Sequence, residues 1–352
     1  MRVLFHIVLL ASLTCSALCR RGDKKDADAV PDAVAYARSY PFDAGLIAQD
    51  LAEVAASPHA LGSARQIEVA VFVEKRALAV GMVVERSAFT AHVPNPVLLE
   101  TPSSPADSTL DRAGINLWAF PFKKEDASCI VLVGSHYDTK EVAGTGYRGA
   151  NDSGSSSVAL VALAGAIKEY HARHPLRCQV ALVWFDGEEA ALPNWTDGET
   201  IHPAKIKDNT YGSRYEAGRL VACGKGQCLP KELGGHGVAA LVLLDMIGSP
   251  DITLTADSHS TPSLDLLVRD IDKQLYPQHT LFLTAAHPVE DDHIPFKEKG
   301  IAVIDLIDFA HLNYWHQAGD DAATVSVPSI VTVSRLALAT ILSLATTGDG
   351  GP

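Results

Sequence analysis

The sequence has no cluster of lysines or arginines, and its acidic residues outnumber its basic ones. It holds 29 Lys and Arg residues against 42 Asp and Glu residues, a formal net charge of −13 at pH 7. An acidic surface repels phosphate backbones, so we expect no nucleic acid as a partner. Internal repeats are absent too. Hydrophobic residues make up 47% of the 352, enough for a large core and too many for global disorder.

Three common catalytic motifs are also missing. There is no H-E-x-x-H segment, which argues against a zinc protease with both histidines on one helix. Gly134-Ser135-His136 does not complete the G-x-S-x-G turn of the α/β-hydrolases. A glycine-rich phosphate loop is absent as well, so nucleotide hydrolysis is not indicated.

A short apolar run stands near the N-terminus, behind the single basic residue Arg2. This pattern predicts a secretory signal peptide over residues 1–19 and a loose charged leader over residues 20–30. An N-terminal anchor is the alternative, although the run is short for a membrane span. Attachment of a lipid at Cys15 or Cys19 is a further alternative, but the residues before each cysteine match a lipoprotein site poorly. We therefore expect a secreted or periplasmic protein.

Four cysteines remain after the leader: Cys129, Cys178, Cys223 and Cys228. They allow three pairings, and export permits disulfides. The short segment from Cys223 to Cys228 contains two glycines and suits local closure. Cys129 and Cys178 each stand at the start of an apolar run. They could form a disulfide between neighbouring strands, or they could remain two buried thiols.

Apolar runs alternate with helical patterns through most of the chain. The runs are residues 130–133, 179–185, 238–244 and 301–307, and the helical patterns are residues 155–170, 264–275 and 326–344. This alternation predicts an α/β layered fold with a sheet buried on both faces. Before it, residues 31–80 have helical spacing, and residues 82–100 and 114–120 are typical of strands. No linker divides residues 31–350, so we expect one catalytic domain.

Ionisable residues follow each apolar run. His136 and Asp138 follow the first, Glu188 and Glu189 the second, Asp245 ends the third, and His316 follows the fourth after a short loop. Ligands of open α/β sheets bind at the carboxyl ends of strands, so these residues are expected to meet at one rim.

Two carboxylates and one imidazole from this set fit a catalytic zinc site. Taken singly, Asp152 could cap a helix, Glu188 and Glu189 could be a solvated pair, and His316 could be a core histidine. Together, Asp152, Glu189 and His316 give three ligands with one open position, and Glu188 is left to move protons.

Several motifs in fixed order carry a family resemblance. They are His136-Tyr-Asp138, Asn151-Asp-Ser-Gly154, Asp186-Gly-Glu-Glu-Ala190, Leu244-Asp-Met-Ile-Gly248 and Asp292-His293. This series resembles the zinc aminopeptidase clan. Trp195, Tyr211-Gly-Ser-Arg214, the segment Glu290–Phe296 and Trp315-His316 make it more similar to the animal-type glutaminyl-peptide cyclotransferases, or glutaminyl cyclases.

The resemblance implies a three-layer fold, with a central, mostly parallel, twisted mixed sheet between helices. It implies one zinc ion per chain on Asp152, Glu189 and His316, and Glu188 as the general acid and base. The further residues it implies are the catalytic pair Asp245 and Asp291, the substrate-binding residues Trp195, Trp315, Glu290 and His311, and His136 and Asp138 beside the metal.

The reaction that the resemblance implies is cyclisation of N-terminal glutamine, with N-terminal glutamate as a second substrate class. Peptides or proteins would be the substrates, and we expect a monomer. The main alternative is a two-zinc aminopeptidase, in which His136 and Asp245 hold a second metal. An inactive binding domain is a further alternative, although no ligand is lost.

Some positions depart from the family pattern. Glu290 stands where animal members have an uncharged amide, and His311 stands where an aromatic residue is expected. One extra residue lies between Glu189 and Trp195. These changes bear on the shape of the pocket and on substrate preference more than on the reaction.

Overall fold

The computed structural model describes residues 32–95, 109–123, 127, 129–142, 144, 146–192, 195–198 and 209–347. These residues belong to one compact unit that begins at Asp32. The predicted signal peptide and leader, with Cys15 and Cys19, lie outside the described residues.

Three helices open the described chain. They are α1 (Ala33–Ser39), α2 (Ala44–Val54) and α3 (Ala64–Ala79). Each begins behind a polar side chain, because the side chains of Asp32, Asp43 and Ser63 accept hydrogen bonds from amides of the first turn. Such caps satisfy backbone donors that have no partner within the helix.

The described residues contain one eight-stranded sheet and a separate two-stranded one. The large sheet has the order β1-β2-β4-β3-β7-β6-β5, with β10 also on β7. Its strands are β1 (Val83–Pro94), β2 (Thr109–Phe120), β3 (Cys129–His136), β4 (Gln179–Phe185), β5 (Val221–Cys223), β6 (Gly226–Cys228), β7 (Gly237–Asp245) and β10 (Ala302–Ile307). The small sheet pairs β8 (Leu254–Asp257) with β9 (Phe282–His287). The central strands β4, β3, β7 and β10 are parallel.

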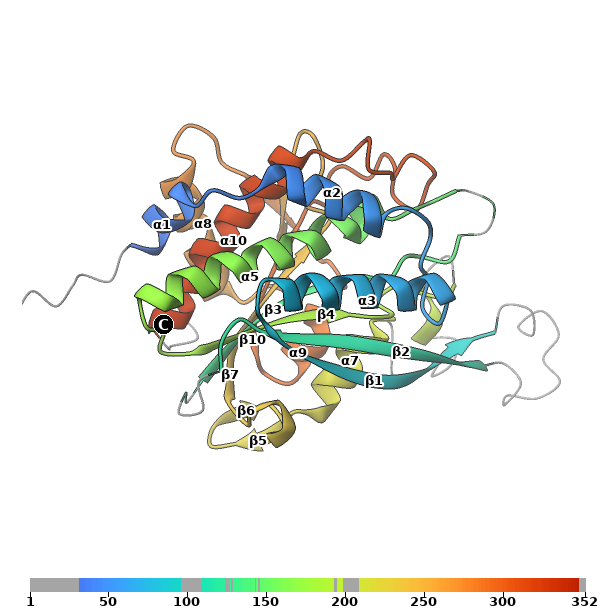
Figure 1. The fold of residues 1–352 in the computed structure, drawn as a ribbon, viewed down its shortest axis with the longest axis horizontal. Helices are drawn as coiled ribbons and strands as arrows, with labels where there is room; N and C mark the ends of the chain where they lie inside the picture. Colours follow the sequence, from blue (N-terminus) through green and yellow to red (C-terminus); the bar gives the residue numbers. More distant parts are fainter. Residues whose placement is uncertain are drawn as a thin grey trace, which may run out of the picture. The chain divides into compact units, whose positions relative to one another are not determined.

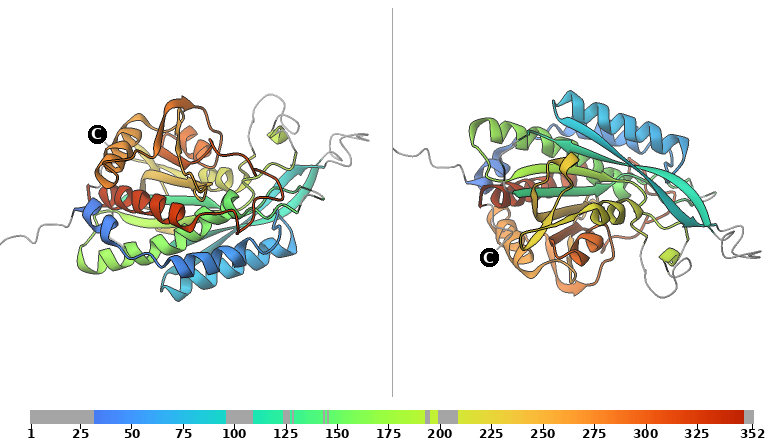
Figure 2. Two further views of the ribbon diagram at one scale, coloured as in Figure 1. Left: turned by 90° about the horizontal axis from the view of Figure 1, so that it is seen from above. Right: turned by 90° about the horizontal axis from the view of Figure 1, so that it is seen from below.

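Helices cover both faces of the large sheet (Figure 1). The remaining helices are η2 (Ala150–Ser155), α5 (Ser156–Arg173), α7 (Tyr211–Arg219), η3 (Lys231–Leu233), α8 (Pro262–Leu275), α9 (His293–Glu298) and α10 (Val327–Thr347). The first three helices, α5 and α10 lie on one face, and α7 and α9 lie on the other. Figure 2 shows α10, α5 and α2 side by side over the sheet.

Successive residues of the central strands enter opposite cores. On β3, Val131 and Val133 pack toward α5 and α10, whereas Ile130 and Leu132 pack toward α7 and α9. This alternation follows from the two-residue period of a strand, and it explains the uninterrupted apolar runs in the sequence. The predicted α/β fold with a mostly parallel central sheet is confirmed.

One element differs from its prediction. The second early strand begins at Thr109, before the expected residue 114, because it pairs with β1 along the whole antiparallel ribbon from Val83↔Phe120 to Pro94↔Thr109.

A long apolar helix, α10, has the length and composition of a membrane span, but 67% of its apolar window is buried, as in a core helix.

Both open cysteine pairs form disulfides. Cys129–Cys178 joins the start of β3 to the residue before β4, and Cys223–Cys228 closes the β5–β6 hairpin. The first pair spans 49 residues and the second spans 5. Chain entropy therefore gives the first bond the larger effect on the unfolded state.

Replacing each pair with alanines tests this difference. We expect loss of Cys129–Cys178 to lower the free energy of unfolding by about 4 kcal/mol, and loss of Cys223–Cys228 by about 2 kcal/mol. Urea denaturation of the two double variants beside the parent chain measures both values. Equal losses would contradict the assignment of the 49-residue bond as the dominant constraint.

Candidate functional site

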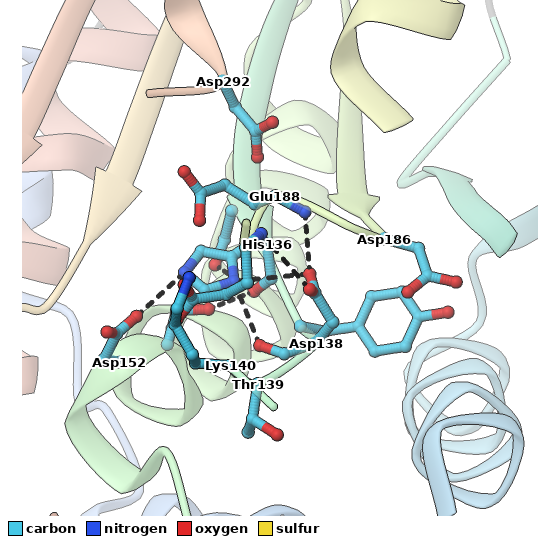
Figure 3. A network of polar contacts seen from close by, with 12 residues as sticks. His136, Asp138, Thr139, Lys140, Asp152, Asp186, Glu188 and Asp292 are labelled. Atoms are coloured by element: carbon cyan, nitrogen blue, oxygen red, sulfur yellow. Dashed lines mark hydrogen bonds and ion pairs between the residues drawn. The ribbon is translucent and has the colours of Figure 1, made fainter. Parts of the chain in front are cut away.

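The ionisable residues expected at one rim do meet there. His136 ends β3, Glu188 and Glu189 follow β4, and Asp245 ends β7. In Figure 3 His136 lies between Asp152 and Asp138, and Glu188 lies between His136 and Asp292. All of these side chains are buried. The parallel order β4-β3-β7 brings the three strand ends together.

Asp152, Glu189 and His316 form a compact group of ligand atoms. One atom from each lies within 4.8 Å of the others. His316 Nε2 is 3.0 Å from Glu189 Oε1 and 3.3 Å from Asp152 Oδ2. The second oxygen of Glu189, Oε2, is buried and has no hydrogen-bond partner among the described residues, which leaves it available to a cation. The donor set of two carboxylates and an imidazole fits zinc.

A turn with little freedom positions Asp152. Gly149 has φ 64°, and a Cβ there would lie 2.5 Å from the Asp152 carbonyl oxygen, so a larger residue does not fit. Asp320 accepts hydrogen bonds from the amides of Asn151 at 2.6 Å and Asp152 at 3.2 Å. Tyr147 donates its hydroxyl to the Asp152 carbonyl oxygen. These contacts fix the backbone on both sides of the carboxylate.

Asp138 positions the two adjacent glutamates. Its carboxylate accepts the amide of Glu188 at 3.0 Å and the amide of Glu189 at 3.3 Å. The same carboxylate lies 3.5 Å from His136 Nδ1. Asp138 thus joins the ends of β3 and β4 without facing the triad itself.

His136 lies between three carboxylates. Its Nδ1 donates to the carbonyl oxygen of Asp138 at 3.1 Å, because a carbonyl can only accept. Its Nε2 lies 3.1 Å from Asp152 Oδ1 and 3.4 Å from Asp245 Oδ1. One atom each of His136, Asp152 and Asp245 also lies within 4.8 Å of the others. The geometry therefore admits a second cation beside the first, as the aminopeptidase alternative requires.

Burial dominates the titration of these carboxyl groups. It raises the pKa of Glu188 well above its ordinary value; the charge of His136 opposes this, and Asp291 adds to it. Burial also raises the pKa of Asp291 to about 7, with Asp245 as the next cause. Burial acts upward on the pKa of Asp152 as well, but hydrogen bonds from His136 and His316 outweigh it and hold that pKa well below its usual range.

Three non-glycine residues with positive φ lie in this region: Trp195 at 53°, Met246 at 47° and His316 at 55°. Such a backbone conformation is strained for residues that carry a Cβ. It persists only where contacts with the surrounding structure hold it in place. The Trp315 ring stacks on the His316 ring with centroids 4.2 Å apart. This stack holds the imidazole against Asp152 and Glu189.

A pocket of about 180 Å³ opens beside the triad. Asp152, Met246, His311, Tyr314 and Trp315 are among its lining residues. The predicted substrate residues His311 and Trp315 therefore share this pocket with a predicted metal ligand. His311 is held by Asp308, whose Oδ2 lies 2.8 Å from His311 Nδ1.

Trp195 lies over a buried cation that the sequence analysis missed. Lys140 Nζ is 5.3 Å from the centre of the Trp195 ring and 3.9 Å from Glu189 Oε2. It also donates to the carbonyl oxygens of Ala190 and Leu192. The Trp195 indole N–H is buried and has no hydrogen-bond partner among the residues that the structure describes.

Not every predicted residue joins the group. Glu290 is exposed. Asp245 and Asp291 are both buried, but the structure shows no hydrogen bond between these two described side chains. Asp320, like Lys140, is a site residue that the sequence motifs did not indicate; its one signal is its position four residues after His316.

Comparisons with known proteins agree with this geometry. The chain matches Peptidase family M28 over residues 119–341. It is 29% identical over 304 residues to a glutaminyl-peptide cyclotransferase-like protein from Bos taurus, and the match covers 78% of this chain and 69% of that protein.

Solved structures share the fold. A glutaminyl cyclase from an Acidobacteriales bacterium superposes with a TM-score of 0.66 at 24% identity, covering 88% of this chain and 96% of that chain. A Zn-dependent exopeptidase from Parabacteroides distasonis superposes with a TM-score of 0.64 at 18% identity, covering 86% and 99%. The resemblance that the motifs indicated is confirmed.

The position of Asp138 gives a test of metal binding. Replacing Asp138 with alanine removes the acceptor for two amides and the partner of His136, so we expect zinc affinity to fall by about 10–100-fold. Competition with a chromophoric chelator measures it. The exposed Asp270→Ala on α8 is the control, and unchanged affinity in Asp138→Ala would contradict the positioning role.

Proposed function

This chain belongs to peptidase family M28, and we propose that within it the chain is a zinc-dependent glutaminyl-peptide cyclotransferase. The reaction closes N-terminal glutamine into pyroglutamate and releases ammonia. One observation carries the proposal: a compact ligand triad with a spare carboxyl group, Glu188, next to an aromatic-lined pocket. The name and the similarity of the Bos taurus relative support it.

Asp152, Glu189 and His316 would hold the catalytic zinc. When bound, zinc polarises a carbonyl group and stabilises negative charge that develops on its oxygen. Asp138 and Asp320 keep the backbone of these ligands in place through its amides. The chain thus supplies both the ligands and the contacts that orient them.

Glu188 is the group that moves the proton. Its backbone is held by Asp138, and its carboxyl group is buried at the rim beside the triad. It would accept a proton from the α-amine as the amine attacks the γ-carbonyl carbon of the same residue. It would then deliver that proton to the departing nitrogen, which leaves as ammonia.

Asp245 would orient the substrate amine, with Asp291 supporting Asp245. Both are buried, and Asp245 Oδ1 has no hydrogen-bond partner in the described residues. The N–H groups of the neutral α-amine offer donors to such an atom. Because the nucleophile belongs to the substrate itself, the site mainly has to hold one bent conformation.

Two indoles would provide the wall for that bent conformation. Trp315 lines the pocket, and its indole N–H would position the side chain of glutamine. Trp195 would supply a further aromatic wall. A hydrolase needs room for water at the same place, whereas ring closure needs water kept out.

Peptides or proteins with N-terminal glutamine are the proposed partners, and the chain is proposed to act as a monomer outside the cytosol. The two disulfides support that location, because such bonds persist in oxidising compartments.

Replacing Glu188 with glutamine tests the assignment. We expect turnover to fall by about 10²–10⁴-fold with zinc retained, because only the proton-transferring group is lost. The readout is ammonia released from a Gln-initiated peptide, with free amino acid measured in parallel. Glu68→Gln, on the exposed side of α3, is the control. Near-normal ammonia release by Glu188→Gln, or release of free amino acid by the parent chain, would overturn the proposal.

His136 separates the cyclase from the two-zinc aminopeptidase. In the cyclase we expect His136→Asn to keep the zinc content of the parent chain and His316→Ala to lose one equivalent. The aminopeptidase would lose one equivalent in both variants, since His136 would be a ligand there. Elemental analysis of the dialysed proteins gives the counts.

A further inference from the structure

A second group of metal-ligand side chains lies outside the triad. One oxygen each of Asp291 and Asp305 and one ring nitrogen of His293 lie within 4.8 Å of one another. Asp291 and His293 flank the start of α9, and Asp305 is on β10. All three are at most 3% exposed. None of them belongs to the catalytic triad.

His293 offers a ring nitrogen toward the two carboxyl groups. Its Nε2 lies 3.2 Å from Asp257 Oδ2, but neither ring nitrogen has a hydrogen-bond partner among the described residues. Asp257 already accepts the amides of His259 and Val289 and the hydroxyl of Ser260. The charge contact with Asp257 leaves Nδ1 open to a cation, and a carboxylate beside the other ring nitrogen is common at histidines that bind a metal.

The candidate ligand atoms have no hydrogen-bond partner in the described part of the chain. His293 Nδ1, both oxygens of Asp305 and Asp291 Oδ2 are buried without one. His293 Nδ1 is 3.8 Å from Asp305 Oδ2, too long for a hydrogen bond but compatible with two ligands of one ion. The charge of two buried carboxyl groups this close has to be offset by a cation or by a proton.

We propose that Asp291, His293 and Asp305 bind a second divalent cation of the zinc class. Two carboxylates and one imidazole repeat the donor types of the triad. The ion would fasten the loop that carries Asp291 to the central sheet, and so hold Asp291 beside Asp245. It is structural and additional to the catalytic zinc, and the zinc counts expected below rest on the proposed single-zinc cyclase.

Zinc content of a matched set of full-length variants tests the site. After loading with ZnSO4 and dialysis, we expect two equivalents in the parent chain, one in Asp305→Asn, one in His316→Ala and none in the double variant. Asp272→Asn is the control, because Asp272 is equally buried but has protein partners for its carboxylate. It should keep two equivalents.

Thermal unfolding shows whether a variant has lost zinc only because it folds poorly. If the ion is present, zinc raises the midpoint of His316→Ala but not that of the double variant. If Asp305 instead carries a proton and no ion binds there, Asp305→Asn keeps the zinc content of the parent chain. That result would overturn the proposal. Zinc that remains in the double variant but is lost when His136→Asn is added would lie at His136 and would count against the cyclase, not against this site. Ammonia release by the parent chain, measured separately, decides the proposed reaction in either case.

Discussion

The structure depends on one electrostatic constraint: many carboxyl groups are buried at the rim where the parallel strands end. Asp138, Asp152, Glu188, Glu189 and Asp245 are each at most 6% exposed. Burial of so much negative charge is unfavourable unless cations, protons or amides compensate it. His136, His316, Lys140 and backbone amides supply part of that compensation. The oxygens without partners mark where the protein leaves charge for a metal ion or a substrate amine.

The sheet makes this arrangement possible because its stability comes from elsewhere. Alternate residues of β3, β4 and β7 fill two separate apolar cores below the rim. These cores can hold strained backbone in place at Trp195, Met246 and His316. The candidate ligand and catalytic residues therefore lie on short segments that follow rigid strands and are held by several contacts.

The sequence predicted the central sheet and the triad because both rest on local patterns. Continuous apolar runs mark strands buried on both faces, and polar residues directly after them mark the rim. Contacts between segments far apart in the chain have no comparable local pattern in the sequence. Asp320 reaches back to Asn151, and the pairing of Cys129 with Cys178 depends on strand order. Asp305 was overlooked because it lies inside the apolar run 301–307. The sequence also did not indicate that Glu290 is exposed while its neighbours Val289 and Asp291 are buried.

The position of α10 constrains the order in which the chain can fold. This helix is the last described element, yet it packs on α1, the first, and contributes many side chains to the larger core of the sheet. Its residue Ala345 also accepts the amides of Arg177 and Cys178, next to the 49-residue disulfide. Contacts between such distant segments form slowly, since a long loop must close before they contribute. During synthesis the part of this core that α10 covers therefore stays open until the ribosome has released residues 327–347.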